Sequence, residues 1–594
     1  MCGFFKLVMW YCVRTPKRIR AELVGDSSEL ERRSVDLRHP YLTRQLIAYL
    51  GNKRKLLPDL YSAFQLVESI GSVSSFLDPF AGSGAVSRLA KLAGYMVFAN
   101  DWESFAFTVC AAHLTIAPDS EFFADYGGVP GVFAYLGTVP NGEPGTMCLR
   151  YSPSRTDSAD FRRERLFYTR ENAMYLDTMR GAIEDLYPGW DLDSPSHEEK
   201  LILLASLVYE AATHANTNGV FKAFHKEFGG FGGEALSRIL APMEMEPPLL
   251  AHGAPSVVGC EDASEFAARH PVDLCYLDPP YNPHQYGSNY HMLNTVVFGD
   301  DPPFDDRRND RGELISRAGI REDWKRTKSP FCSRRTAAAA FARLFGSIDA
   351  RFILLSYNTD GTCDAEEMFE LLANQGSVRL INREYVAYPG GKQSIHRLTH
   401  GQELLFVLDR SGGFDTSSRG EMQRRICERQ VGSLLKRPLH PLRVHEHFAS
   451  EAGRAIFARV DGSVFDVPSA TLALGRVQDA DSVLSRLSSE TLFDLRRRLL
   501  TCMFRDRVEE AEALLNLLND SDSPEIRAKA ISQLLHTTKK FAFRKYRERF
   551  EVIMDRIGTL LSGSQEFVRS ETRFAEIRAI ADRRFNSHIE NTPR

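Results

Sequence analysis

The stretch VDLCYLDPPYNPHQYGSNY, residues 272–290, decides the fold class of this chain. It begins as a short, mostly apolar run, which is typical of a buried strand, and it ends in a DPPY sequence at residues 278–281. Four more compact apolar runs flank it, at residues 74–80, 95–101, 352–357 and 402–409. Amphipathic segments separate these runs. The alternation predicts an α/β sheet protein.

The DPPY sequence at residues 278–281 suits a planar aromatic amine as substrate. Ligands of open α/β sheets bind at the carboxyl ends of strands, where Asp278 and the Pro279 carbonyl offer two acceptors to an exocyclic amine. The two prolines fix φ and remove backbone donors, and Tyr281 offers a flat face for stacking. The alternative interpretation is a plain strand-ending turn, because Pro-Pro sequences punctuate many loops.

A loop of small residues predicts a cofactor site in the same sheet. FLDPFAGSGAVS, residues 76–87, places two glycines between a strand and a helix, where a ligand can approach the backbone. The pattern is neither GxGxxG nor GxxxxGK[ST], so a dinucleotide and a nucleoside triphosphate are not favoured. The next strand ends in Asp101, whose carboxylate can accept hydrogen bonds from both ribose hydroxyls. An adenosine-containing cofactor fits these features.

Composition and charge limit the class of protein, the ligands and the compartment that the sequence allows. The chain has 594 residues, of which 43% are hydrophobic and 26% charged, as expected of a globular protein with two or three folding units. Its formal net charge of -4 means that nucleic-acid binding would require local basic patches. The ten cysteines include no CxxC pair, and the sequence has neither a signal-peptide charge order nor a membrane-length apolar stretch. We expect a cytoplasmic protein without a metal site or a membrane contact.

The ordered motifs of residues 41–409 resemble the Dam-like, or alpha-type, class of S-adenosylmethionine-dependent N6-adenine DNA methyltransferases. These motifs are YLGNKRKLLPDL (49–60), FLDPFAGSGAVSRLA (76–90), ANDWE (99–103), CED (260–262), LDPPYN (277–282) and ELLFVLDR (403–410). The likeness extends to modification methylases that share NTNGVFKAF, LDPPYNPHQYGSNYHMLNT and LLSYN. It implies a Rossmann-like catalytic domain, S-adenosylmethionine as cofactor and double-stranded DNA as substrate.

The resemblance also implies roles for individual residues. The implied catalytic residues are Asp278, Pro279, Pro280 and Tyr281. The implied cofactor-binding residues are Tyr49, Gly51, Asn52, Lys53, Asp78, Pro79, Phe80, Gly82, Gly84, Asp101 and Asp262. In the family, DPPY is associated with adenine N6 and SPPY with cytosine N4. The expected reaction is direct methyl transfer to an adenine flipped out of the duplex, in restriction modification or self-marking.

Three of the cofactor assignments have a simpler alternative. Lys53 could be a solvated lysine, Asp101 a turn residue, and Asp262 the N-cap of a helix that begins with ASEFAARH.

Contacts with DNA are expected from polar and basic segments outside the motifs. A turn at residues 216–219 and a basic stretch at residues 307–335 are suited to phosphates and groove edges. The predicted DNA-binding residues are Asn216, Asn218, Lys222, Arg321, Lys325 and Lys328. A surface loop without DNA contacts is the alternative for the basic stretch.

We therefore expect four parts. They are an N-terminal arm (1–38), a catalytic domain (39–109 and 256–409), an inserted target-recognition lobe (110–255) and a mainly helical extension (421–594) after the Gly- and Ser-rich residues 410–420. The extension has no derivable function, and three roles stay open: binding a protein partner, recruiting the enzyme to DNA, and closing the substrate groove. Two functional alternatives stay open: an adenine methyltransferase that acts on structured RNA, and a catalytically weak DNA-binding regulator.

Overall fold

The computed structural model describes residues 34–189, 196–229, 235–359, 361–381, 403–412 and, with short gaps, 419–586. The predicted N-terminal arm lies outside the described residues apart from residues 34–38. The chain divides into two compact units, one of residues 1–385 with 403–416 and the other of residues 386–402 with 417–594. Each unit has its own architecture.

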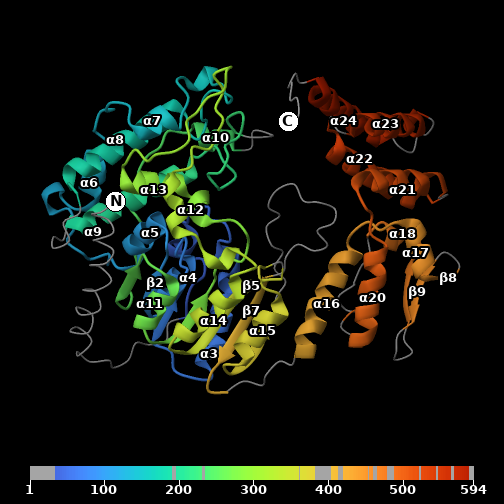
Figure 1. The fold of residues 1–594 in the computed structure, drawn as a ribbon, viewed down its shortest axis with the longest axis horizontal. Coiled ribbons are helices and arrows are strands. Elements are labelled where there is room, and N and C mark those ends of the chain that lie inside the picture. The colour runs from blue at the N-terminus through green and yellow to red at the C-terminus, as the bar shows by residue number, and fades with distance from the viewer. Residues whose placement is uncertain are drawn as a thin grey trace. The chain divides into compact units, whose positions relative to one another are not determined.

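A seven-stranded, mostly parallel sheet forms the centre of the first unit, in the order β3-β2-β1-β4-β5-β7-β6 (Figure 1). The strands are β1 (Ser75–Asp78), β2 (Met96–Asn100), β3 (Ser256–Gly259), β4 (Val272–Leu277), β5 (Ala350–Asn358), β6 (Ser377–Ile381) and β7 (Glu403–Asp409). Strands β1 to β5 pair in parallel, whereas β7 is antiparallel to both β5 and β6. The predicted α/β fold with a Rossmann-like sheet is confirmed.

The chain winds outward from β1 in both directions. Leu77 of β1 pairs with Phe98 of β2 on one side and with Cys275 of β4 on the other. Such a switch point opens a crevice at the carboxyl ends of the two inner strands. Strand β7 runs the opposite way, so its first residue, Glu403, pairs with Asn358 at the end of β5. The start of β7 therefore lies at the ligand-binding edge of the sheet.

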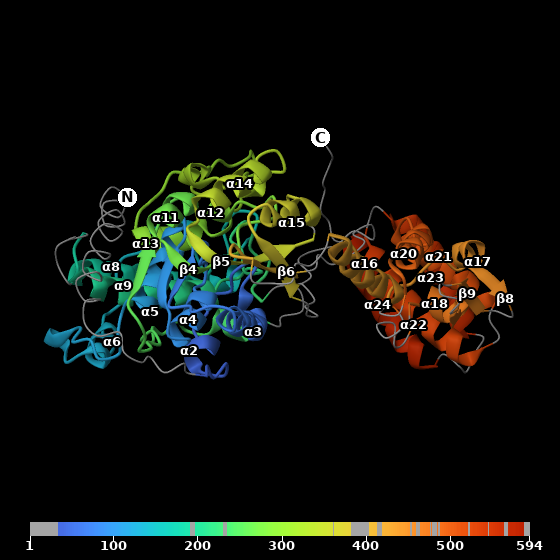
Figure 2. The same ribbon diagram turned by 90° about the horizontal axis from the view of Figure 1, so that it is seen from below.

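Helices cover both faces of the sheet. Figure 2 shows α3 (Leu57–Glu68) and α4 (Ala85–Leu92) on one face, and α14 (Ala337–Ser347) and α15 (Ala365–Ala373) on the other. Helix α4 follows β1 directly, so its N-terminus begins at the glycine loop.

A helical lobe is inserted between β2 and β3. After α5 (Ser104–Leu114) it contains α6 (Val129–Leu136), α7 (Thr146–Arg150), α8 (Arg170–Leu186), α9 (Ser196–Thr213) and α10 (Leu236–Leu240). Helix α9 packs against α5 and against α13 (His291–Phe298). Leu203 and Leu204 of α9 belong to the same hydrophobic core as Phe76 and Val97 of the sheet. The lobe and the sheet therefore share one core.

The second unit is mainly helical, as predicted. Its helices are α16 (Arg419–Leu435), α17 (Pro441–His447), α18 (Ser469–Ala473), α20 (Ser489–Thr501), α21 (Arg507–Asp520), α22 (Pro524–Phe541), α23 (Arg547–Ser562) and α24 (Val568–Asn586). A small antiparallel sheet joins β8 (Ala449–Glu451), β9 (Arg454–Ala458) and β10 (Val464–Pro468). In neither unit is a described helix both long and apolar enough to cross a bilayer.

Candidate active site

A pocket at the carboxyl ends of β1, β2 and β4 brings the sequence motifs together. Its lining residues from those motifs are Tyr49, Leu50, Gly51, Pro79, Phe80, Asn100, Asp101, Trp102, Glu103, Glu261, Asp262, Asp278, Pro280 and Tyr281. Ala263, Tyr286, Thr327, Ser329 and Phe331 complete the lining. Segments more than 200 residues apart in sequence thus meet at the crevice that the sheet topology predicts.

Lys53 lies at the centre of a buried charge cluster beside this pocket. Its Nζ is 2.9 Å from Oδ1 of Asp278 and 2.7 Å from Oε1 of Glu403, and its side chain is only 6% exposed. Tyr281 donates its hydroxyl proton to Oε2 of Glu403 at 3.3 Å, and its ring centre is 5.5 Å from the Lys53 ammonium. Lys53 is therefore no solvated lysine: it does not line the pocket itself, but its ammonium faces Asp278 and Tyr281, which do.

Burial and neighbouring charges act in opposite directions on this cluster. Burial raises the pKa of the Asp278 carboxyl, Lys53 lowers it, Glu403 raises it, and the net shift is upward. Burial alone would lower the pKa of Lys53, but Asp278 and Glu403 outweigh it and hold that pKa well above its ordinary value. Lys53 is therefore a fixed positive charge next to a carboxylate of raised basicity.

The residues around Lys53 shape the segment that presents it. Asn52 caps the short helix η1 (Lys53–Leu56) by accepting a hydrogen bond from the Arg54 backbone, and it donates to the Ile47 carbonyl at 3.1 Å. Gly51 has a φ of 83°, a left-handed conformation that favours glycine. Tyr49 stacks on Tyr290 with ring centres 4.8 Å apart. Asn52 thus acts on the backbone, whereas Tyr49 and Gly51 line the pocket.

The loop after β1 needs its glycines. Gly82 and Gly84 have φ values of 51° and 74°, and a Cβ added to Gly82 would lie 2.8 Å from the ring of Tyr49. Beneath the loop, Asp78 is 1% exposed and accepts a hydrogen bond from the Ser87 hydroxyl through Oδ2 at 2.7 Å. Its Oδ1 has no hydrogen-bond partner among the described residues. Burial raises the pKa of Asp78 to about 7, against the effect of the Ser87 hydrogen bond.

Two more acidic residues lie at the ends of neighbouring strands. Asp101 accepts backbone hydrogen bonds from Gly82 and Glu103, and burial raises its pKa to about 6. Asp262 caps α11 (Ala263–Arg269) because its Oδ1 accepts from the backbones of Ser264 and Glu265. It also lines the pocket, so the helix cap and the pocket position are not exclusive alternatives.

The sequence prediction of the site does not name Trp102 and Glu103, which line the pocket, or Glu403, which lies beside it. Trp102 and Glu103 follow Asp101 directly, and an aromatic side chain after the acidic strand end is a local signal that could have indicated them. Glu403 begins the motif ELLFVLDR but was predicted only as part of a strand. Its place beside Lys53 depends on the direction of β7, for which the sequence gives no local signal.

Two predicted DNA-binding residues are buried and bonded within the fold. Asn216 is 0% exposed and donates its side-chain amide to the Leu166 carbonyl at 2.9 Å. Arg321 is 1% exposed and forms ion pairs with Asp300 at 3.0 Å and Asp323 at 2.7 Å. The expectation that these two side chains contact DNA therefore does not fit the structure.

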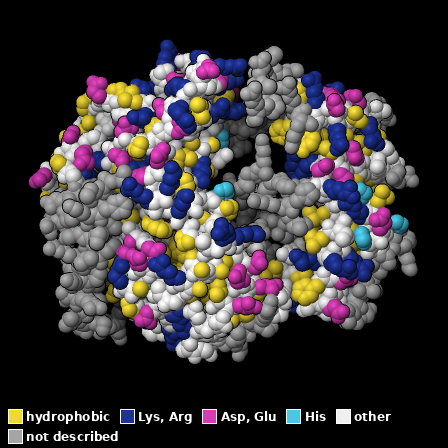
Figure 3. Space-filling model, viewed as in Figure 1, with side chains coloured by type: hydrophobic (Ala, Val, Ile, Leu, Met, Phe, Trp, Pro, Cys, Tyr) yellow, Lys and Arg dark blue, Asp and Glu magenta, His cyan; other side chains and the backbone are white. Residues whose placement is uncertain are grey.

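The other four predicted DNA-binding residues are exposed: Asn218, Lys222, Lys325 and Lys328. The Lys328 ammonium lies 5.4 Å from the ring centre of Trp324. On the face shown in Figure 3, Lys and Arg side chains are interspersed with Asp and Glu. The exposed residues of this set are available for contacts with a ligand in solution.

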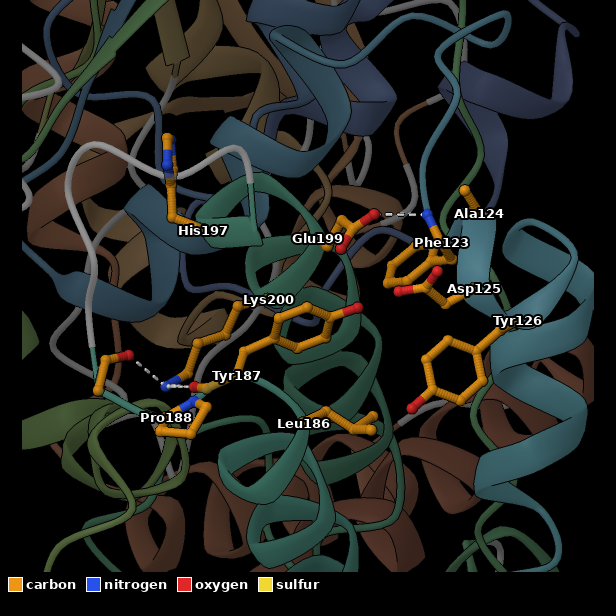
Figure 4. Close-up of a pocket in the computed structure, with 11 residues that line it drawn as sticks. Phe123, Ala124, Asp125, Tyr126, Leu186, Tyr187, Pro188, His197, Glu199 and Lys200 are labelled. Carbon is orange, nitrogen blue, oxygen red and sulfur yellow. Dashed lines mark hydrogen bonds between the residues drawn. The ribbon is translucent and has the colours of Figure 1, made fainter.

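A second cavity, of about 480 Å³, lies in the inserted lobe (Figure 4). Two of its charged groups are bonded within the lobe: the Phe123 backbone donates to Glu199, and Lys200 donates to the carbonyls of Tyr187 and Gly189. None of the sequence motifs contributes to its lining. The candidate active site is therefore the pocket at the sheet edge and not this cavity.

A comparison with known sequences shows which family this chain is similar to. Residues 49–128 and 147–307 match the D12 class N6 adenine-specific DNA methyltransferase family. This part of the chain is similar to that family. The D12 match begins at Tyr49 and extends beyond Tyr281, so it includes the pocket motifs from the first up to DPPY.

Curated relatives of this chain are named as type II methyltransferases or modification methylases. The type II methyltransferase M.NlaIII of Neisseria lactamica is 28% identical over 61% of this chain and 99% of its own length. The modification methylase StsI of Streptococcus sanguinis is 28% identical over 61% of this chain, and the type II methyltransferase M.FokI of Planomicrobium okeanokoites is 25% identical over 66%. The matches span 52% of StsI and 57% of M.FokI. No solved structure matches the chain.

Proposed function

We propose that this protein transfers a methyl group from S-adenosylmethionine to N6 of an adenine flipped out of double-stranded DNA. The observation that carries the proposal is the convergence of the Asp278 carboxylate, the glycine loop and Asp101 on one pocket. The D12 class match supports the choice of adenine N6. The names of the relatives support a role in restriction modification or self-marking, which we place in the cytoplasm.

The residues of the pocket fit S-adenosylmethionine, which supplies an electrophilic methyl group when bound. Asp101 offers a carboxylate at the end of β2 for ribose hydroxyls, and Trp102 offers a flat apolar face for an adenine. Asp262 caps α11 through Oδ1, so its Oδ2 can accept from an exocyclic amino group. Asp78, with a buried and unpartnered Oδ1 within the described structure, supports the loop at the methionine end.

At the substrate end, the DPPY residues orient the attacking amine. Asp278 and the Pro279 carbonyl accept the two N–H groups of N6, which leaves the nitrogen lone pair directed at the methyl group. Tyr281 stacks on the flipped base. The raised pKa of Asp278 suits a carboxylate that takes a proton from N6 as the new C–N bond forms and the methyl–sulfur bond breaks, with its electron pair left on sulfur. The side chains supply position and a proton acceptor without forming a covalent intermediate.

The exposed residues of the predicted DNA set complete the proposal. We assign phosphate and groove contacts to Asn218, Lys222, Lys325 and Lys328, because exposed lysines can replace counterions on the DNA backbone. For the second unit we keep only the proposal of a protein partner.

Transfer of labelled methyl groups from S-adenosylmethionine to unmethylated genomic DNA and, in parallel, to total RNA tests the proposal. The nucleosides are then separated after digestion. N6-methyladenine in DNA alone is the expected result. Label in RNA alone would overturn the substrate, and label in neither, with S-adenosylmethionine binding intact, would overturn the activity.

A further inference from the structure

The reversed direction of β7 brings a second carboxylate to the active site. The parallel strands β1, β4 and β5 deliver their last residues to the ligand-binding edge, whereas the antiparallel β7 delivers its first, Glu403. The Glu403 side chain is 5% exposed, and both of its oxygens are used at this edge. Oε1 lies 2.7 Å from the Lys53 ammonium, and Oε2 accepts the Tyr281 hydroxyl at 3.3 Å.

We propose that Glu403 is a positioning residue for methyl transfer, which holds the Lys53 ammonium and the Tyr281 ring in place beside Asp278. The inference rests on the proposed function. A buried carboxylate is unfavourable unless it is paired, and here one ammonium serves two carboxylates. A neutral side chain would avoid this cost, so the second negative charge is best explained by an effect on the reacting carboxylate.

Sharing Lys53 keeps Asp278 basic. Without Glu403, the ammonium would interact with Asp278 alone and would make that carboxylate a weaker acceptor for the N6 proton. Glu403 pairs with Lys53, which weakens the interaction of the ammonium with Asp278, and its own negative charge lies close to Asp278. The same carboxylate anchors the hydroxyl of Tyr281, which fixes the plane on which the base stacks. Glu403 thus acts through Lys53, Asp278 and Tyr281 and touches no substrate atom.

The other polar groups around this cluster come from several elements. Asp59 of α3 and Ser356 of β5 line a small cavity of about 20 Å³ next to Glu403. Tyr276 of β4 donates its hydroxyl proton to Ser356 at 3.0 Å. The remaining titratable neighbours of Asp278 are Asp78 and Tyr286. Within this set Lys53 carries the one positive charge. The local electrostatics therefore depend on how the Lys53 ammonium interacts with each of the two carboxylates, Asp278 and Glu403.

The test compares the full-length protein with Glu403→Gln and Lys53→Met. For Glu403→Gln, we expect kcat to fall on the order of tenfold, with S-adenosylmethionine affinity within about threefold of the wild type. The acid limb of the kcat profile should move to lower pH, because a negative charge that raises the pKa of Asp278 is gone. In Lys53→Met the same limb should move to higher pH. Shifts of opposite sign would be hard to obtain from general damage to the fold.

The matched control is Asp409→Asn, at the other end of the same strand. Asp409 is also buried, at 0% exposure, and its carboxylate lies 3.2 Å from the Arg351 guanidinium. We expect this variant to unfold at a lower temperature with an unshifted acid limb. A Glu403→Gln protein with unchanged kcat, or with an unshifted limb as in Asp409→Asn, would overturn the inference.

A second variant and the activity of the wild type cover the cases in which Glu403→Gln does not fold or the proposed function is wrong. If Glu403→Gln does not fold, Glu403→Asp retains the charge but shortens the side chain, and it should lower kcat without moving the acid limb. Unchanged kcat in Glu403→Asp would then overturn the inference. Failure of the proposed function looks different, since the wild type itself would transfer no methyl group to DNA.

Discussion

The backbone N–H of Gly82 donates a hydrogen bond of 2.8 Å to Oδ2 of Asp101, which ties the loop after β1 to the end of β2. The other oxygen of Asp101 accepts the Glu103 backbone at 2.9 Å. The proposed ribose acceptor is therefore also the anchor of the glycine loop. A change at either residue should affect cofactor binding and local stability together.

Asp101→Asn tests this double role. An amide has one acceptor oxygen, so its NH2 group would face one of the two backbone N–H groups and leave it unsatisfied, at a cost of about 1–3 kcal/mol. We expect weaker S-adenosylmethionine binding in calorimetry and a lower unfolding temperature. Asp119→Asn, at a 77% exposed side chain, should change neither. Wild-type cofactor affinity in Asp101→Asn would argue against the ribose assignment.

Gly82→Ala should separate backbone strain from steric conflict when it is compared with Gly94→Ala. Both glycines have positive φ, but a Cβ on Gly94 meets nothing within 4 Å, whereas one on Gly82 lies 2.8 Å from the Tyr49 ring. Gly94→Ala should therefore lower the free energy of unfolding, measured with urea, by about 1–2 kcal/mol, which is the cost of the left-handed backbone alone. Gly82→Ala should lose more and should also bind S-adenosylmethionine poorly. Equal losses would mean that the Tyr49 ring moves aside freely.

Asp278→Ala should abolish turnover but retain the cofactor. Lys53 keeps Glu403 as its partner in this variant, so the pocket is expected to stay folded. We predict a loss in kcat of at least about 10²-fold, with S-adenosylmethionine affinity within a few fold of the wild type. Single-turnover transfer and calorimetry on the same sample measure the two effects. A parallel loss of both would instead make Asp278 a cofactor ligand.

Three buried carboxyl groups near the pocket should make the protein more stable as the pH falls from neutral. Burial raises the pKa of Asp78 and Glu103 to about 7 and that of Asp101 to about 6. The folded state therefore binds these protons more tightly than the unfolded state, so their contribution to the free energy of unfolding increases as the pH falls from about 8 to 5. Thermal unfolding over this range should show a shallower slope in Glu103→Gln than in the wild type. Identical slopes would contradict the raised pKa of Glu103.

Lys325→Ala and Arg321→Ala should differ although both residues lie in the basic stretch. Lys325 is exposed, so its removal should weaken DNA binding and reduce the salt dependence by about one counterion, with stability unchanged. Arg321→Ala leaves Asp300 and Asp323 without their guanidinium and should destabilise the protein by about 2 kcal/mol, since these carboxylates are partly exposed. Binding measured at several salt concentrations, together with thermal unfolding, decides both cases. A Lys325→Ala protein with the wild-type salt slope would exclude its phosphate contact.

Much of the sheet is predictable because its central strands are buried on both faces. The apolar runs before Asp78, Asp101 and Asp278 match β1, β2 and β4 in type and position. The predicted strands do not include β3 or β6. Length is not the reason, because β1 and β2 also have four and five residues. The difference is in composition: β3 ends in Gly259 and β6 has Arg379 at its centre, so neither is an uninterrupted apolar run. The inserted lobe is found from the gap between strands, but its shared core with the sheet depends on tertiary contacts.

The same distinction applies to the site. Residues next to strand ends, such as Asp101 and Asp278, are predictable because the strand itself carries them to the ligand edge. From the sequence alone, the charge of Arg321 predicts a DNA contact as well as the charge of Lys325 does. In the folded chain, however, Arg321 is paired with Asp300 and Asp323. Local sequence shows the type of a side chain, whereas burial and pairing are properties of the folded chain.

The common core of the sheet and the lobe limits how the lobe could acquire a new target sequence in its proposed role of target recognition. Exchanging residues 115–255 for those of a relative would replace one part of a packed interior, including Leu203 and Leu204, while the rest of that interior stays unchanged. New specificities are therefore expected to arise by substitution in exposed turns such as the one at Asn218, and chimeras cut at the lobe boundaries should fold poorly.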